Sequence, residues 1–209
     1  MTSLPSSRRA PSQLLFLPGA SGNTAFWQPL AERLETGAPR AVVAWPGFGQ
    51  EPPSPAIQGF DDLVDRVVAR IDRPTALIAQ SIGGAIAVRA ALAAREQVTH
   101  LVLAVTSGGI DTQGLGAQDW RTGFAAANPT YPDWLATFRS DLSHELRDIR
   151  QPVLLLWGDA DPYSPVAVGE RLRALLPDAR LHVVAGGTHD LARDHAAALA
   201  PLVDAHLAR

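Results

Sequence analysis

Six short apolar segments recur along the chain, and longer segments with helical periodicity separate most of them. The apolar segments lie at residues 13–18, 41–45, 75–79, 100–106, 152–157 and 180–185. They are apolar throughout rather than alternating, which is typical of strands buried on both faces of a parallel sheet. Short apolar strands that alternate with helices favour an α/β fold with right-handed crossovers. In such folds ligands bind at the carboxyl ends of the strands.

Five segments carry the apolar spacing of three and four residues that is typical of helices. They lie at residues 24–35, 59–71, 82–95, 165–176 and 191–207. The clearest example has Leu63, Val64, Val67, Val68 and Ile71 on one face. We therefore predict a mostly parallel sheet flanked by helices.

One long segment, residues 107–149, interrupts this alternation. It begins with a glycine-rich stretch and then carries Trp120, Phe124, Tyr131, Trp134 and Phe138. We predict a helical insertion over the sheet, within a single domain that spans residues 1–209. Two interpretations of its aromatic side chains stay open: they form a small core of the insertion itself, or they line a ligand pocket beneath a lid. Residues 1–12, rich in Ser and Pro, are expected to form a loose arm.

Composition excludes several classes of partner. The 209 residues carry a formal net charge of −3 with scattered basic residues, which argues against nucleic acid and anionic membrane surfaces as partners. The apolar run Leu14–Leu17 is too short for a signal peptide, whose apolar region needs about 7–15 residues. The absence of cysteine excludes disulfides and thiolate metal sites, and it fits a cytoplasmic location. Nothing in the sequence indicates an oligomeric state.

Three residues that follow predicted strands have the chemistry of an acyl-transfer site. Ser81 follows the third strand, Asp161 the fifth and His189 the sixth. A serine hydroxyl is a weak nucleophile and needs a base such as histidine, whose ordinary pKa is about 6.5. The imidazole in turn needs a carboxylate that fixes its tautomer and stabilises its charged form. The small residues around Ser81 suit a nucleophile on a sharp turn between strand and helix.

Five stretches make the chain resemble the α/β-hydrolase superfamily. They are residues 79–84 (AQSIGG), 17–22 (LPGASG), 156–162 (LWGDADP), 184–189 (VAGGTH) and, less closely, 45–49 (WPGFG). The resemblance implies a catalytic triad of Ser81, Asp161 and His189. It also implies an oxyanion hole formed by the backbone N–H groups of Ile82 and Ala20.

The chain departs from the superfamily pattern in several places. Ala79 stands where glycine is usual, Pro18 where many members have histidine, and Ala44 where an acidic residue is common. The N-terminal antiparallel hairpin of the family has no room in 12 residues, so we expect a trimmed version of the fold.

Other residues compete for two of the three roles. Five further histidines are present, namely His100, His144, His182, His195 and His206, but His189 alone follows a strand behind glycines. The Gly-x-x-Asp spacing of the family selects Asp161 as the acid and leaves Asp159 to organise the loop. Asp111 is a further candidate for the acid of the triad, because some members of the family place the acid after an earlier strand.

The sequence thus predicts a serine hydrolase that cleaves a carboxylic ester or thioester of a small molecule through an acyl-serine intermediate. The resemblance implies neither a metal nor an organic cofactor. Candidate substrate contacts are Gln80, Trp120, Phe124, Trp134 and Phe138, whereas Trp27 is expected to be core. Two alternatives remain: a carbon–carbon bond hydrolase or lyase of the same fold, and a receptor of the hydrolase fold that binds without turnover.

Overall fold

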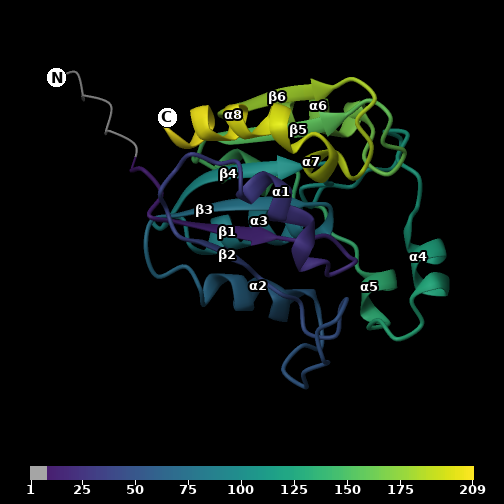
Figure 1. Cartoon of the computed structure of the whole chain (residues 1–209). Helices are drawn as coiled ribbons and strands as arrows, with labels where there is room; N and C mark the ends of the chain where they lie inside the picture. The colour runs from purple at the N-terminus through teal and green to yellow at the C-terminus, as the bar shows by residue number, and fades with distance from the viewer. Residues whose placement is uncertain (1–8) are drawn as a thin grey trace.

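A six-stranded parallel sheet forms the centre of the computed structural model, which describes residues 9–209 (Figure 1). The strands are β1 (Gln13–Leu17), β2 (Arg40–Val42), β3 (Thr75–Gln80), β4 (Val98–Ala104), β5 (Val153–Gly158) and β6 (Ala179–Val184). They lie in the order β2-β1-β3-β4-β5-β6, and every neighbouring pair is parallel. All six predicted strands are confirmed. Of the predicted arm over residues 1–12, residues 1–8 lie outside the described part.

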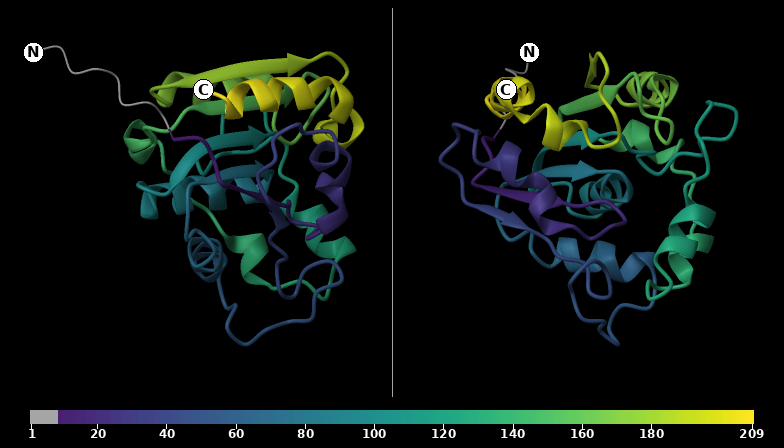
Figure 2. Two further views of the ribbon diagram at one scale, coloured as in Figure 1. Left: turned by 60° about the vertical axis from the view of Figure 1, so that its left-hand side comes forward. Right: turned by 45° about the vertical axis from the view of Figure 1, so that its right-hand side comes forward.

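Helices cover both faces of the sheet. The α-helices are α1 (Gln28–Ala31), α2 (Phe60–Val68), α3 (Ile82–Ala93), α4 (Arg121–Ala127), α5 (Trp134–Thr137), α6 (Val166–Leu175), α7 (Leu191–Asp194) and α8 (Ala196–Leu207). Two 3-10 helices are η1 (Thr24–Trp27) and η2 (Glu145–Asp148). Helices α1, α7 and α8 lie on one face, and α2, α3 and α6 lie on the other (Figures 1 and 2). This confirms the predicted fold class.

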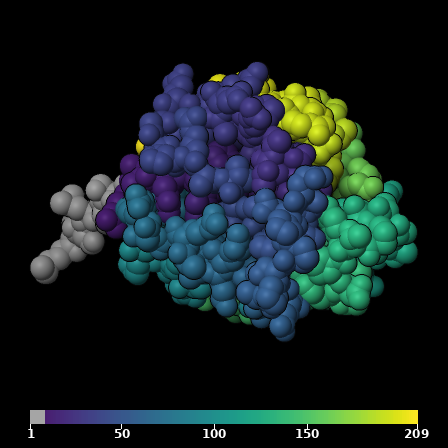
Figure 3. All heavy atoms as spheres, turned by 60° about the horizontal axis from the view of Figure 1, so that its bottom comes forward, coloured from purple at the N-terminus to yellow at the C-terminus, as the bar shows by residue number. Residues whose placement is uncertain are grey.

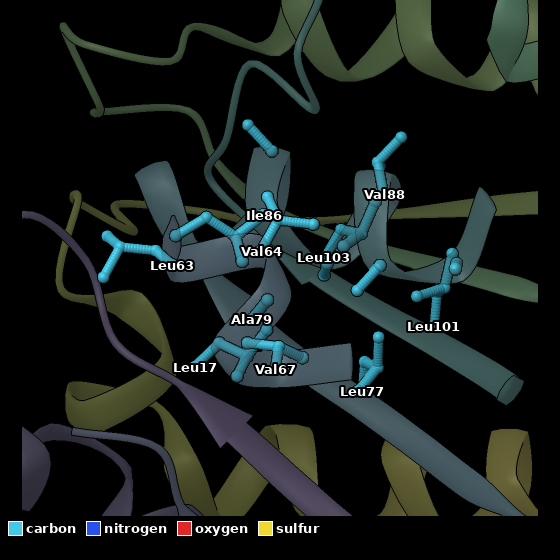
Figure 4. Close-up of a cluster of buried hydrophobic side chains, with 14 of the residues drawn as sticks. Leu17, Leu63, Val64, Val67, Leu77, Ala79, Ile86, Val88, Leu101 and Leu103 are labelled. Carbon is cyan, nitrogen blue, oxygen red and sulfur yellow. The ribbon is translucent and has the colours of Figure 1, made fainter. Parts of the chain in front are cut away.

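The core consists of two apolar layers, one on each face of the sheet. Figure 4 shows the layer under α2 and α3, where Val67 and Ile86 pack near Leu77 and Ala79 of β3. The layer on the opposite face includes Trp27, which is fully buried and donates its indole N–H to Leu17 O at 3.1 Å. The prediction that Trp27 belongs to the core is confirmed.

The expectation that all six strands are buried on both faces is wrong at the edges of the sheet. Every residue of β6 is either exposed or only partly buried, and Val183 is 39% exposed. Strand β2, at the other edge, begins with two exposed residues. An edge strand has a neighbour on one side only, so the flanking helices cover it less completely than the central strands.

Two predicted helices are each divided into two. The segment predicted over 24–35 is η1 followed by α1, and Pro29 lies in the first turn of α1, where a missing N–H costs nothing. The segment predicted over 191–207 is α7 followed by α8, separated at His195, whose φ of −109° and ψ of 22° are not helical.

Residues 107–149 are here named the β4–β5 connection, and their helices α4 and α5 lie beyond the ends toward which the strands point (Figure 1). Four of its aliphatic side chains, Ile110, Leu135, Leu146 and Ile149, are buried in the core layer of α2 and α3. Its aromatic side chains are partly buried against the same layer. The connection is therefore packed against the body of the molecule. In the described part of the chain, no helix has the length and apolarity required to cross a membrane.

The last helix buries a histidine whose titration should couple to folding. His206 is 4% exposed and donates its Nε2–H to Leu101 O at 3.0 Å. Its pKa is lowered to about 4, first by burial and then by the neighbouring His100 and Arg209, against smaller opposing effects of the Leu101 hydrogen bond and Asp178. The unfolded chain therefore binds a proton at this position at a higher pH than the folded chain does.

We expect stability to fall as pH falls from about 6.5 to about 4, because only the unfolded state takes up the His206 proton in that window. The loss should approach about 3 kcal/mol by the lower end of this range. His206→Gln keeps an N–H donor but cannot titrate, so its free energy of unfolding should decline less over the same range. Urea unfolding of both proteins at a series of pH values measures this. Parallel declines would show that other groups govern the acid sensitivity.

Candidate active site

The backbone of Ser81 has an unusual conformation at the junction of β3 and α3. Its φ of 54° and ψ of −126° lie in a region that residues other than glycine rarely adopt. Two hydrogen bonds hold the turn: Ser81 N donates to Ala104 O at 3.1 Å, and the Thr106 hydroxyl donates to Ser81 O at 2.5 Å. Such strain persists only where the surroundings enforce it, and it is common at functional sites.

Glycines allow the first turn of α3 to approach its surroundings closely. A Cβ atom on Gly83 would lie 2.6 Å from Pro18 O, and one on Gly84 would lie 2.4 Å from the Thr106 hydroxyl oxygen. A Cβ on Gly19 would lie 3.1 Å from the Ser81 Cβ. The loop after β1, which carries Ala20, therefore packs directly against Ser81 and the start of α3, where Ile82 lies.

The loops after β5 and β6 form a second pair of closely packed turns. Asp161 accepts a hydrogen bond from the Tyr163 N–H at 2.9 Å through Oδ1, and its Oδ2 lies 2.7 Å from Nδ1 of His189. The Asp161 side chain is fully buried, whereas that of His189 is 27% exposed. Since a carboxylate can only accept, Nδ1 carries the proton, and Nε2 is left available to act as a base.

Asp159, the competing carboxylate, lies in the same loop and has a different partner. Its Oδ1 accepts a hydrogen bond from Gly186 N at 2.6 Å, which joins the loops after β5 and β6. Asp111, the third candidate, accepts a hydrogen bond from Gln113 N at 2.9 Å within its own turn. Of these three carboxylates, Asp161 is therefore the one that contacts the His189 ring.

Ser81 and His189 line one cavity of about 360 Å³. Ile82 also lines this cavity, and the β4–β5 connection contributes many of the other lining residues, including Leu135 and Phe138. The cavity has a mixed lining, since its polar residues include Asp111, Asp119, Arg121, Arg139 and Tyr163. The Tyr163 ring packs edge-on against the His189 ring, with centroids 5.4 Å apart.

The predicted substrate contacts are placed in several different environments. Trp120 and Phe138 line the main cavity, and Trp120 also lines a second cavity of about 90 Å³ together with Phe124. Trp134 lies outside both linings and packs near Phe48, with ring centroids 5.9 Å apart.

Gln80 is also placed away from the cavity lining. Its side chain is 5% exposed and donates from Nε2 to the His189 backbone carbonyl at 3.2 Å. A Cβ on Gly19 would lie 2.2 Å from Gln80 Oε1, so the amide group is packed between the Ala20 loop and the His189 loop. Gln80, predicted as a substrate contact, thus lies between these two loops and outside the linings of both cavities.

Sequence reasoning missed two residues near this site. Thr106 ends the fourth predicted strand and has no predicted role, yet its hydroxyl holds the Ser81 turn. Tyr163 follows the Gly-x-x-Asp motif within two residues, which was the available signal for its position beside His189.

Comparisons with known proteins agree with this architecture. The chain is 32% identical over 96 residues to a pimeloyl-[acyl-carrier protein] methyl ester esterase of Aliivibrio salmonicida. This alignment covers 46% of this chain and 36% of that protein. It is 29% identical over 154 residues to the protein of the same name from Neisseria meningitidis serogroup C. That alignment covers 73% of this chain and 57% of the relative. The chain thus aligns with about a third to somewhat over half of the length of these relatives.

A solved structure, a lipase-esterase related protein from Clostridium acetobutylicum, has the same fold. It superposes with a TM-score of 0.73 over 96% of both chains, at 19% sequence identity. The model of the alpha/beta hydrolase family matches residues 14–202, nearly the whole of the described chain. The chain therefore belongs to the alpha/beta hydrolase family.

Proposed function

We propose that this chain is a serine carboxylesterase that hydrolyses small acyl esters through an acyl-serine intermediate. One observation carries the proposal: Ser81, on its strained turn, lines the same cavity as His189, whose Nδ1 is bonded to the buried Asp161. The names of the curated relatives, which are methyl ester esterases, favour an oxygen ester over a thioester or a carbon–carbon bond.

In the proposed mechanism His189 Nε2 takes the proton from Ser81 Oγ as the hydroxyl attacks the ester carbonyl. Asp161 holds the imidazole in the required tautomer and stabilises its positive charge. The N–H groups of Ala20 and Ile82 donate to the oxyanion of the tetrahedral intermediate. Protonated His189 then releases the alcohol, and water hydrolyses the acyl-serine by the same steps.

The charges around the cavity favour a substrate without net charge. The lining holds two arginines, Arg121 and Arg139, and two aspartates, Asp111 and Asp119, so their formal charges cancel. The backbone N–H of Arg121 donates a hydrogen bond to Asp119, and the Arg121 guanidinium group forms an ion pair with the same carboxylate. Both contacts lower the pKa of Asp119 below its ordinary value, so this carboxylate stays ionised beside the arginine. We propose that the β4–β5 connection serves as a lid, and that its cavity-lining side chains contact the acyl chain.

The first test is hydrolysis of p-nitrophenyl esters from acetate to dodecanoate, with Ser81→Ala as the control. We expect the wild type to turn over, and we expect Ser81→Ala to lose roughly four orders of magnitude in kcat or more, because no other nucleophile replaces the hydroxyl. The melting temperature should stay nearly unchanged, since only an oxygen atom is removed. Turnover that survives in the variant would show that a residue other than Ser81 is the nucleophile.

A matched pair of substitutions tests the acid. Asp161→Asn should lower kcat by about 10³–10⁴-fold, because the amide no longer enforces the required His189 tautomer. Asp159→Asn keeps an oxygen that can accept the Gly186 hydrogen bond, so its kcat should stay within a few-fold of wild type. Steady-state kinetics on one ester compares the two. Equal losses, or a larger loss for the Asp159 variant, would contradict the assignment.

Phe138 provides a test of the lid. Its ring lines the cavity on one side and stacks on Phe60 on the other, with centroids 3.8 Å apart. Phe138→Ala should enlarge the cavity and shift the optimum of kcat/KM toward longer acyl chains. It should also destabilise the fold by about 3 kcal/mol or somewhat less, because the ring is only partly buried. An unchanged chain-length profile would show that this wall does not contact the acyl group.

A further inference from the structure

Tyr131, in the β4–β5 connection between α4 and α5, joins two loops that are distant in sequence. Its hydroxyl donates to the Ser21 carbonyl at 2.9 Å, and it accepts a hydrogen bond from the Gly49 N–H at 2.9 Å. Ser21 follows Ala20 in the loop after β1, and Gly49 lies in the loop after β2. The Tyr131 hydroxyl thus acts both as a donor and as an acceptor, and both partners are backbone groups of these two loops.

The two loops that receive Tyr131 form one unit, because their backbones are in direct contact. Gly49 has a φ of +58°, and a Cβ there would lie 3.0 Å from Ser21 O. Gly22 has a φ of +63°, and a Cβ there would lie 2.5 Å from the Cβ of Phe48. Neither position tolerates a side chain without displacement. This contact provides a route by which a displacement of the loop after β2 can reach the loop that carries Ala20.

Aromatic packing brings the Tyr131 ring to this unit. The ring lies edge-on to Phe48 at 5.4 Å and to Phe124 at 5.2 Å between centroids. Figure 3 shows the blue segment that includes residues 45–60 lying against the green atoms of the connection. Apolar contacts of this kind give affinity without a fixed direction, whereas the two hydrogen bonds fix the orientation of the connection relative to the Ser21 carbonyl.

We propose that Tyr131 is a positioning residue that couples the placement of the lid to the placement of the Ala20 N–H. An oxyanion donor acts only if it is already held in place when charge develops on the substrate oxygen. The Tyr131 hydroxyl restrains the residue that follows Ala20 and the loop packed on it, so a seated lid and an ordered oxyanion loop form together. The catalytic part of this inference rests on the proposed esterase function; the structural coupling does not.

The test compares Tyr131→Phe with a matched control, Thr137→Val. The phenylalanine keeps the ring packing and loses only the hydroxyl. Thr137 lies in the same connection, and its hydroxyl donates to Trp134 O within α5, away from the two loops. Amide hydrogen exchange is measured on both variants and the wild type. The kcat and KM for p-nitrophenyl acetate are measured alongside, since acetate is the smallest acyl group of the series and minimises contacts with the connection.

We expect Tyr131→Phe to exchange about tenfold faster both at Gly49 and across residues 19–22, in line with the loss of one or two hydrogen bonds. Its kcat for acetate should fall about tenfold with KM nearly unchanged. Thr137→Val should match the wild type in exchange at these loops and in both kinetic constants.

Two results would overturn the coupling, and a third would overturn its catalytic part. Unchanged exchange at Gly49 would show that the bridge is not formed in solution. Faster exchange at Gly49 with wild-type exchange over residues 19–22 would show that the effect stops at the loop after β2. Faster exchange in both loops with an unchanged kcat would reduce Tyr131 to a structural contact. A wild type without any ester turnover would instead refute the proposed function, and the exchange data would still decide the structural coupling.

Discussion

The left-handed backbone of Ser81 is the constraint on which the surroundings of the site depend. A residue with a side chain in such a region costs on the order of 1–3 kcal/mol, and the cost persists only where neighbours hold the turn. Here the Thr106 hydroxyl bonds the Ser81 carbonyl, and Gly83 and Gly84 let α3 approach the loop after β1 and the end of β4. Ser81 lines the cavity from this turn, and the same close approach brings the Ala20 loop next to it.

Around this turn the molecule places its polar groups at one end of a parallel sheet. The loops after β5 and β6 are held together by the Asp159 contact to Gly186 and by the Asp161 contact to His189. Gln80 then ties the His189 loop to the residue that precedes Ser81. The β4–β5 connection closes the remaining side, and Tyr131 joins it to the two loops on the far side of Ser81. Ser81, Asp161, His189 and the loop that carries Ala20 are thus each held by a specific neighbour.

Local pattern was sufficient for the strands, because an apolar run of five to seven residues has few other ways to be buried. It also placed Ser81, Asp161 and His189 at the ends of strands, where a parallel sheet brings such residues together. It failed at β6, because exposure depends on the position of a strand in the sheet and not on its own residues. It could not place Gln80 or Tyr131, since their partners lie 109, 110 and 82 positions away in the chain. Side chains of this kind are directed by tertiary packing, which leaves no local periodicity to read.

The most direct test of the account is the mass of the acyl-enzyme. The protein is mixed with excess p-nitrophenyl ester and quenched in acid within the burst phase, and its peptides are then mapped by mass spectrometry. The account predicts one acyl group per chain, located on Ser81, with release of an equal amount of p-nitrophenol. Turnover with no adduct, or an adduct on a residue other than Ser81, would contradict the central claim that this strained serine is the nucleophile.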